Sequence, residues 1–123
     1  MFSPGDVILF WSDEAGKPKF HLCISLSGHF LYVNTPKPRS YPGDFIIPCS
    51  DLPFLHPTKS GYSAISCSVV LRKSEDVLRR LKAKRVGSVS PLLLRKLIEF
   101  IDHSIVLSDE DKEDALEGLG DWI

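Results

Sequence analysis

The feature that most constrains the fold is a change of hydrophobic period near residue 74. Before it, short runs of apolar and β-branched residues alternate with proline- and glycine-rich segments, which is typical of strands joined by turns. After it, apolar residues recur at steps of three and four, which is typical of amphipathic helices. Because the strands come first and the helices later, the sequence predicts an α+β domain and not a parallel sheet with alternating crossovers.

Six segments have the character of short strands: residues 6–11, 20–26, 30–34, 44–48, 62–71 and 86–89. The second and third are expected to form a hairpin, because only a few residues including Gly28 separate them. Five or six short strands can curl and close into a small barrel, which removes exposed sheet edges. We therefore expect a mainly β body over about residues 4–89.

Three helices are predicted from their capping residues. Ser74 is the expected N-cap of a short helix with acidic residues in its first turn. Ser90-Pro91 marks the start of an amphipathic helix over about residues 90–104, whose leucine face must be buried on the sheet or on a second copy of the chain. An acidic helix is expected over about residues 108–118. These parts fit a single domain of 123 residues.

Composition indicates a cytoplasmic chain without a metal site. No stretch approaches the ~18 apolar residues of a membrane span, and the first residues lack a signal-peptide pattern. Cys23, Cys49 and Cys67 show no Cys-x-x-Cys spacing, so free thiols in a reducing compartment are expected. A zinc site made of Cys49, His56 and Cys67 would have no standard spacing, and we expect neither metal nor cofactor.

Charge is distributed unevenly along the chain. Residues 1–101 hold 14 Lys or Arg and 8 Asp or Glu, whereas residues 102–123 hold 1 Lys and 8 acidic residues. A basic body suits a polyanionic partner, because neutralisation of phosphates drives nucleic-acid binding. The acidic end is interpreted as a solvated helix, with competition for the basic surface as the alternative.

Four short motifs in a fixed order resemble the MazF/PemK family of toxins from bacterial toxin–antitoxin modules. Gly-Asp-Val-Ile at residues 5–8 resembles the family's opening strand, and residues 16–25 are similar to its Gly-x-Arg-Pro-x-x-Val-Ile/Leu-Ser segment. Ile-Pro-Cys-Ser at residues 47–50 resembles its Pro-x-Thr strand end. Residues 84–90 are similar to Lys-x-x-Gly-x-Val/Leu-x before the family's long helix. The resemblance spans about residues 4–104.

The resemblance implies an SH3-like barrel, usually dimeric, that cleaves single-stranded RNA without metal and is regulated by an antitoxin. The family's Arg and Thr match Lys19 and Ser50 of this chain. Ser keeps the hydroxyl group, but Lys lacks the bidentate fork of Arg, which is not a conservative change. The reaction needs a cation and proton-transfer groups, for which His21 and His56 are the candidates. His21 has a core position inside an apolar strand as its alternative interpretation.

Four further residues are candidates for RNA binding. Arg39 and Tyr41 lie in a proline-rich loop, where a cation and an aromatic ring can hold a phosphate and stack a base. Lys84 and Arg85 belong to the densest basic stretch of the chain. Arg39, Lys84 and Arg85 each have a solvated surface position as their alternative.

A different class of function remains open from the sequence. The missing Arg also fits a non-catalytic SH3-like module that binds nucleic acid or protein and has lost the active site. Growth upon induced expression separates the two hypotheses, because a toxin stops growth and a binding module need not.

Overall fold

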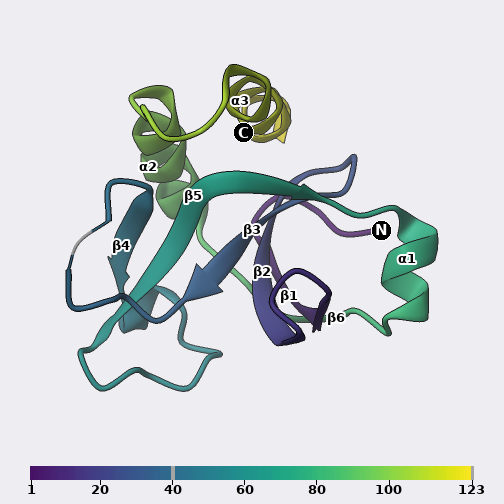
Figure 1. Cartoon of the computed structure of the whole chain (residues 1–123), viewed down its shortest axis with the longest axis horizontal. Coiled ribbons are helices and arrows are strands. Elements are labelled where there is room, and N and C mark those ends of the chain that lie inside the picture. Colours follow the sequence, from purple (N-terminus) through teal and green to yellow (C-terminus); the bar gives the residue numbers. More distant parts are fainter. Residues whose placement is uncertain (40, 123) are drawn as a thin grey trace.

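The computed structural model describes residues 1–39 and 41–122. Strands form one sheet, two helices lie together over one side of it, and a short helix lies beyond one end (Figure 1). The strands are β1 (Asp6–Ser12), β2 (Lys17–Ser25), β3 (His29–Asn34), β4 (Asp44–Pro48), β5 (Tyr62–Arg72) and β6 (Lys84–Ser88). The helices are the 3-10 turn η1 (Cys49–Asp51), α1 (Glu75–Arg80), α2 (Pro91–Asp102) and α3 (Asp109–Trp122). The predicted α+β class is confirmed.

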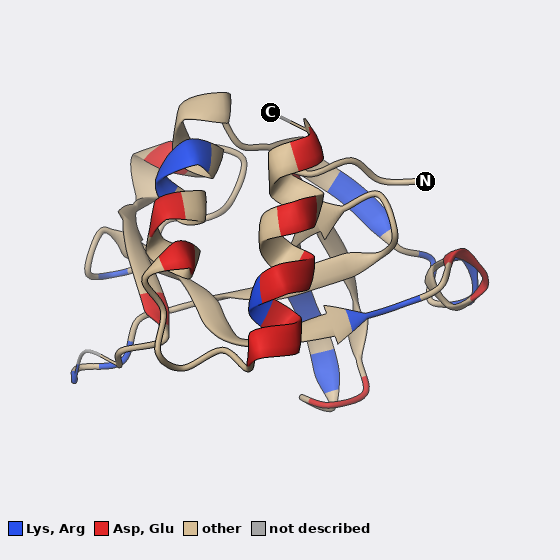
Figure 2. Ribbon diagram, turned by 90° about the horizontal axis from the view of Figure 1, so that it is seen from above, with Lys and Arg blue, Asp and Glu red and all other residues tan. Residues whose placement is uncertain are grey.

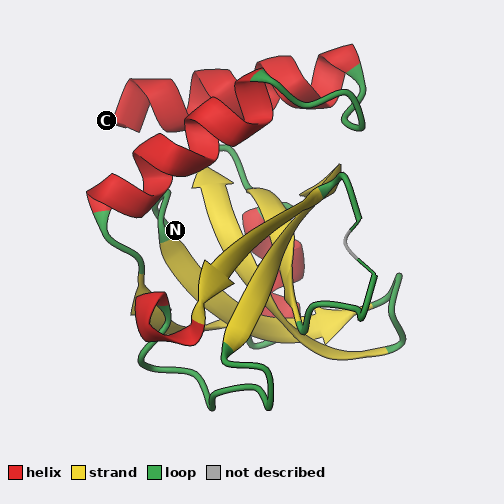
Figure 3. Ribbon diagram, turned by 90° about the vertical axis from the view of Figure 1, so that its left-hand side faces the viewer, coloured by secondary structure: helices red, strands yellow, loops and turns green. Residues whose placement is uncertain are grey.

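The sheet is antiparallel and its strand order is β4-β5-β3-β2-β1-β6. The predicted hairpin is β2–β3, and its turn contains Gly28 at φ +83°. The sheet is strongly curled (Figure 3). A Cβ on Gly87 of edge strand β6 would lie 2.3 Å from the ring of Phe54, in the loop after the opposite edge strand β4. The curl thereby brings the loop that follows β4 against β6.

The two faces of the sheet bury different sets of side chains. Against one face, Leu97 and Ile101 of α2 pack in a cluster with Leu22, Leu31 and Ile65 of the strands. The opposite face holds a smaller cluster with α1: Ile8, Phe10, Cys23, Phe30, Leu71 and Leu78. This division follows from the alternation of side chains along each strand. The leucine face of α2 is thus buried within the chain itself.

The predicted N-cap residues Ser74 and Ser90 are confirmed. The Ser74 hydroxyl accepts a hydrogen bond from the backbone N–H of Val77, and the Ser90 hydroxyl accepts one from that of Leu93. Each bond satisfies an amide that has no partner within its helix. Among the described residues, no helix is both long enough and apolar enough to cross a membrane.

Helix α3 runs through Gly118 to Trp122, so the prediction that it ends near Gly118 is wrong. Gly118 lies where α3 touches β2: a Cβ there would be 2.5 Å from the carbonyl oxygen of Ile24 and 2.7 Å from Cβ of Ser25. The glycine therefore permits close packing of helix on sheet and does not end the helix. Sequence alone does not separate these two uses of glycine.

A bulge in β5 is held by α3. Opposite β3, Phe30 pairs with Leu71 but Tyr32 pairs with Ser66, so residues 67–70 of β5 have a single residue of β3 against them. The N–H of Val70, within this bulge, donates to Asp111 Oδ2 of α3 at 3.0 Å. Arg72 joins the same carboxylate at 2.9 Å. The acidic helix thus provides a partner for an amide of the irregular part of β5.

Candidate functional site

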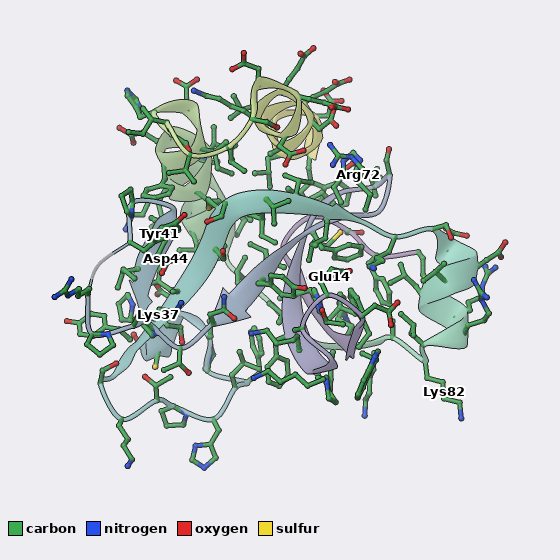
Figure 4. All side chains as sticks on the ribbon, in the orientation of Figure 1. Glu14, Lys37, Tyr41, Asp44, Arg72 and Lys82 are labelled. Carbon is green, nitrogen blue, oxygen red and sulfur yellow. The ribbon has the colours of Figure 1, made fainter. Side chains whose placement is uncertain are left out.

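A polar groove of about 520 Å³ lies beside the ends of three strands and the middle of a fourth. It is lined by side chains from β2, β3, the loop before β4, the start of β4 and the middle of β5: Lys17, Lys19, Asn34, Thr35, Lys37, Tyr41, Asp44, Ser66 and Ser68. The lining holds three lysines and one carboxylate, so the groove carries a positive charge. In Figure 4, Lys37, Tyr41 and Asp44 lie together at one side of the molecule, well away from Arg72 and Lys82.

Strand alternation places Lys19 in the groove. On β2, Lys19, His21 and Cys23 share one face of the sheet. His21 and Cys23 are buried, whereas Lys19 lies toward the start of the strand, where the lining becomes polar. The proline-rich loop then turns back, and the N–H of Asp44 donates to the carbonyl oxygen of Tyr41 at 2.9 Å. The turn brings both residues to the groove.

Lys19 is held by two neighbours on β3. Its ammonium group donates a hydrogen bond to Asn34 Oδ1 and lies 5.2 Å from the centre of the Tyr32 ring, within the range of a cation–π contact. The Tyr32 hydroxyl is 2.6 Å from that of the buried Ser12. Burial lowers the pKa of Lys19, and the charge of Lys17 lowers it further. The group is a positioned cation that releases its proton more easily than an ordinary lysine.

Asp44 is the single carboxylate among the groove residues. Burial raises the pKa of Asp44, while the charge of Lys37 acts in the opposite direction. A carboxylate of raised pKa is a stronger base than an exposed one, and an ammonium group of lowered pKa is a stronger acid. Asp44 and Lys19 are therefore a stronger base and a stronger acid that line one groove together with Lys17 and Lys37.

The structure corrects the proton-transfer role expected for His21. Its side chain is fully buried, and its ring stacks on Phe10 with centroids 3.7 Å apart. Neither ring nitrogen has a hydrogen-bond partner among the described residues, and burial lowers the pKa of His21 to about 4. A ring enclosed in the core does not reach a substrate, so His21 belongs to the packing under the groove.

Ser50 and His56 lie outside the groove. Ser50 is exposed in η1, beyond the end of β4, and His56 is exposed in the loop that follows. The Nδ1 atom of His56 lies 3.3 Å from the carbonyl oxygen of the neighbouring Pro57. Neither lines the groove together with Lys19. The expected catalytic set is therefore not assembled in one place: of its four residues, Lys19 alone lines the groove.

The expected RNA-binding residues are also divided. Tyr41 lines the groove, whereas the exposed Arg39 of the same loop does not. Lys84 and Arg85 lie on β6, at the far edge of the sheet from β4. Arg85 Nη1 is 3.6 Å from Asp6 Oδ1. These two residues therefore belong to a separate surface.

The structure gives the burial of the three cysteines and the arrangement of the side chains that could bind a metal ion. The three cysteines are free thiols, of which Cys23 and Cys67 are buried. Burial raises the pKa of Cys23 to about 11 and that of Cys67 to about 12. Across residues 1–39 and 41–122, no three His, Cys, Asp or Glu side chains are arranged to hold a metal ion.

Sequence reasoning missed most of the groove. The residues that it did not single out are Lys17, Asn34, Thr35, Lys37, Asp44, Ser66 and Ser68. Strand alternation links Ser66 and Ser68 to one face, and it links Lys17 to Lys19, so part of the signal was present in the sequence. Ser66 pairs with both Asp44 and Tyr32, which joins β4, β5 and β3 at this point. That pairing was not evident in the sequence.

Comparison with known proteins leaves the groove to be interpreted from its own chemistry. No protein-family model, no curated protein and no solved structure matches the chain.

Proposed function

We propose that the chain is a MazF/PemK-like endoribonuclease that cleaves single-stranded RNA in the groove around Lys19 and Asp44. The observation that carries the proposal is the presence of an acid–base combination within a cluster of three lysines. Lysine ammonium groups attract the RNA backbone through its phosphates. The Tyr41 ring, which is half exposed at the rim, offers a face on which a base can stack.

The proposed reaction uses the ribose 2′-oxygen as the nucleophile. As this oxygen bonds to the adjacent phosphorus, the Asp44 carboxylate accepts the 2′-hydroxyl proton and the bond between phosphorus and the 5′-oxygen breaks. The Lys19 ammonium group offsets the charge that develops on the phosphorane and donates a proton to the departing 5′-oxygen. The products are a 2′,3′-cyclic phosphate and a 5′-hydroxyl end, and proton exchange with water restores both side chains.

Two features of Lys19 support this role. The bond to Asn34 and the contact with Tyr32 fix the ammonium group before substrate arrives, and a charge that is already in place costs no reorganisation in the transition state. The lowered pKa assists proton donation as well. The substitution of Lys for the family's Arg is thus compatible with catalysis, because the charge is positioned by neighbours and not by a bidentate fork.

Incubation of the purified protein with a long single-stranded RNA in EDTA tests the proposal. We expect cutting by the native protein, with cyclic phosphate and 5′-hydroxyl ends on the products. Lys19→Ala and Asp44→Asn should each slow cutting by about 10²-fold or more, as expected for loss of general acid–base catalysis.

Ser50→Ala is the matched control, because Ser50 is exposed outside the groove. Its rate should equal that of the native protein. Full activity of Asp44→Asn would remove Asp44 from the mechanism. A loss of cutting activity in Ser50→Ala as large as in Lys19→Ala would instead place the catalytic site at η1. Retained RNA binding without any cutting by folded native protein would favour the non-catalytic binding module.

The family assignment extends the proposal to partners. An SH3-like barrel, a homodimer and a separate antitoxin are parts of the same hypothesis, supported by the order of the four motifs and by the curled sheet followed by helices. Induced expression should stop cell growth, and Lys19→Ala should relieve the arrest.

A further inference from the structure

A second recess lies against the loop and strand that form the groove wall. It has a volume of about 460 Å³, between the start of β4 and the last turns of α2. Its apolar surface comes from Pro42, Phe45, Phe100 and Ile105. Phe45 and Phe100 are tilted at 39° with centroids 5.1 Å apart. Both rings are partly exposed, and Ile105 is 92% exposed.

The rim of this recess is polar and nearly neutral. Lys96, Glu99, His103 and Ser104 contribute to its lining. The Nδ1 atom of His103 is engaged with the carbonyl oxygen of Glu99 at 2.9 Å, which leaves Nε2 for a ligand. A recess lined by aromatic and apolar side chains together with hydrogen-bond donors and acceptors suits a nucleobase, whereas the opposed charges of Lys96 and Glu99 do not favour a bare phosphate.

Only a thin ridge separates the recess from the groove. Residues 41–45 form it: Tyr41 and Asp44 line the groove, while Pro42 and Phe45 line the recess. Gly43 is buried within this segment, and a Cβ there would lie 2.5 Å from Oγ of Ser68, 3.0 Å from Cε1 of Tyr41 and 3.3 Å from Cγ1 of Val106. One short segment of the chain therefore borders both depressions.

We propose that the recess lined by Phe45, Phe100 and Ile105 is a base-binding subsite for a nucleotide flanking the phosphate held in the groove. The proposal rests on the proposed function for the position of that phosphate. Aromatic surface accepts any base through stacking. The subsite would add affinity for longer RNA without contact to the reacting atoms.

The test measures the affinity of 2′-O-methyl oligonucleotides, in which the nucleophile is blocked, by fluorescence anisotropy. A dinucleotide and a hexanucleotide of mixed sequence are compared. Phe100→Leu removes an aromatic face and keeps apolar volume, and Ile105→Ser changes a side chain that the fold does not bury. Each should weaken hexanucleotide binding about tenfold and leave dinucleotide binding unchanged.

Controls and contrary outcomes separate this inference from the proposed catalysis. Phe54→Leu and Leu92→Ser change a partly buried Phe and an exposed apolar residue elsewhere, and they should bind both oligonucleotides normally. Unchanged hexanucleotide affinity in Phe100→Leu and Ile105→Ser overturns the subsite, as does a complete lack of oligonucleotide binding by the native protein. A length-dependent loss in a protein that cuts no RNA would support the subsite and reject the catalytic proposal.

Discussion

At the scale of single residues, His21 shows how the core supports the groove and what that support costs. Its ring lies between Phe10, on which it stacks, and Tyr32, whose ring centre is 5.2 Å away. Tyr32 in turn contacts Lys19. Burial in this apolar setting disfavours the charged imidazole, which is why the pKa of His21 falls to about 4.

The lowered pKa predicts a pH-dependent stability. His21 is neutral in the folded and unfolded states above the ordinary pKa of 6.5; as the pH falls, the unfolded chain takes up the proton first. The free energy of unfolding should therefore decrease by about 3 kcal/mol between pH 6.5 and pH 4 through this residue alone. Urea unfolding of the native protein and of His21→Phe at both pH values measures the effect.

His21→Phe keeps the stacking on Phe10 but cannot be protonated, so its stability should fall less over this pH range. Any cost of the larger ring cancels in the comparison between pH values. His56→Gln is the control, because His56 is exposed, and it should retain the native pH dependence. An equal pH dependence in His21→Phe and the native protein would show that His21 is not the residue responsible.

At the scale of elements, the packing of α3 depends on one glycine. Gly118 lies against the backbone of β2, whereas a Cβ on Gly120 of the same helix would have no atom within 4 Å. Because both glycines lie in α3, alanine raises the helix propensity at either position. A difference between the two substitutions therefore measures the steric contact at Gly118.

Gly118→Ala should lower the free energy of unfolding by roughly 1–3 kcal/mol, since the added methyl group meets backbone that cannot move freely. Gly120→Ala should be neutral or more stable by up to about 1 kcal/mol, because alanine is the better helix former. Chemical denaturation of the two variants provides the measurement. Equal effects of the two substitutions would contradict the close contact between α3 and β2.

At the scale of the whole molecule, charge is separated in space as well as along the chain. Figure 2 shows Asp and Glu residues along most of the length of α3. The lysines of the groove belong to β2 and to the loop before β4, and no residue of α3 lines the groove. The acidic helix is therefore not in competition for the groove within this chain.

This separation predicts how the proposed RNA binding responds to salt. Each groove lysine that neutralises a phosphate contributes to the salt dependence, so Lys37→Gln should reduce the slope of log affinity against log salt by about one unit or slightly less. Lys112→Gln on α3 should leave the slope unchanged. Affinities at several salt concentrations measure both slopes, and an equal reduction by the two variants would place the RNA elsewhere.

The sequence predicted local structure better than the arrangement of the site. Residues 44–48 were expected as a strand and form β4 with the same bounds, because alternation and flanking prolines act over a few residues. Lys19 was singled out through its motif. Asp44 and Lys37 were not, because their position beside Lys19 depends on the pairing of β4, β5 and β3, which no local pattern encodes. The same holds for His21, whose burial depends on three neighbouring strands.

The bond from Val70 to Asp111 has a consequence for the order of synthesis. Residues 109–122 follow every strand in the chain, so a ribosome makes the whole sheet before it makes the carboxylate that holds the bulge of β5. Ser68, within that bulge, is part of the groove wall. A nascent chain that has not yet reached Asp111 therefore lacks the partner of the Val70 amide, next to the part of β5 that supplies Ser68 to the groove.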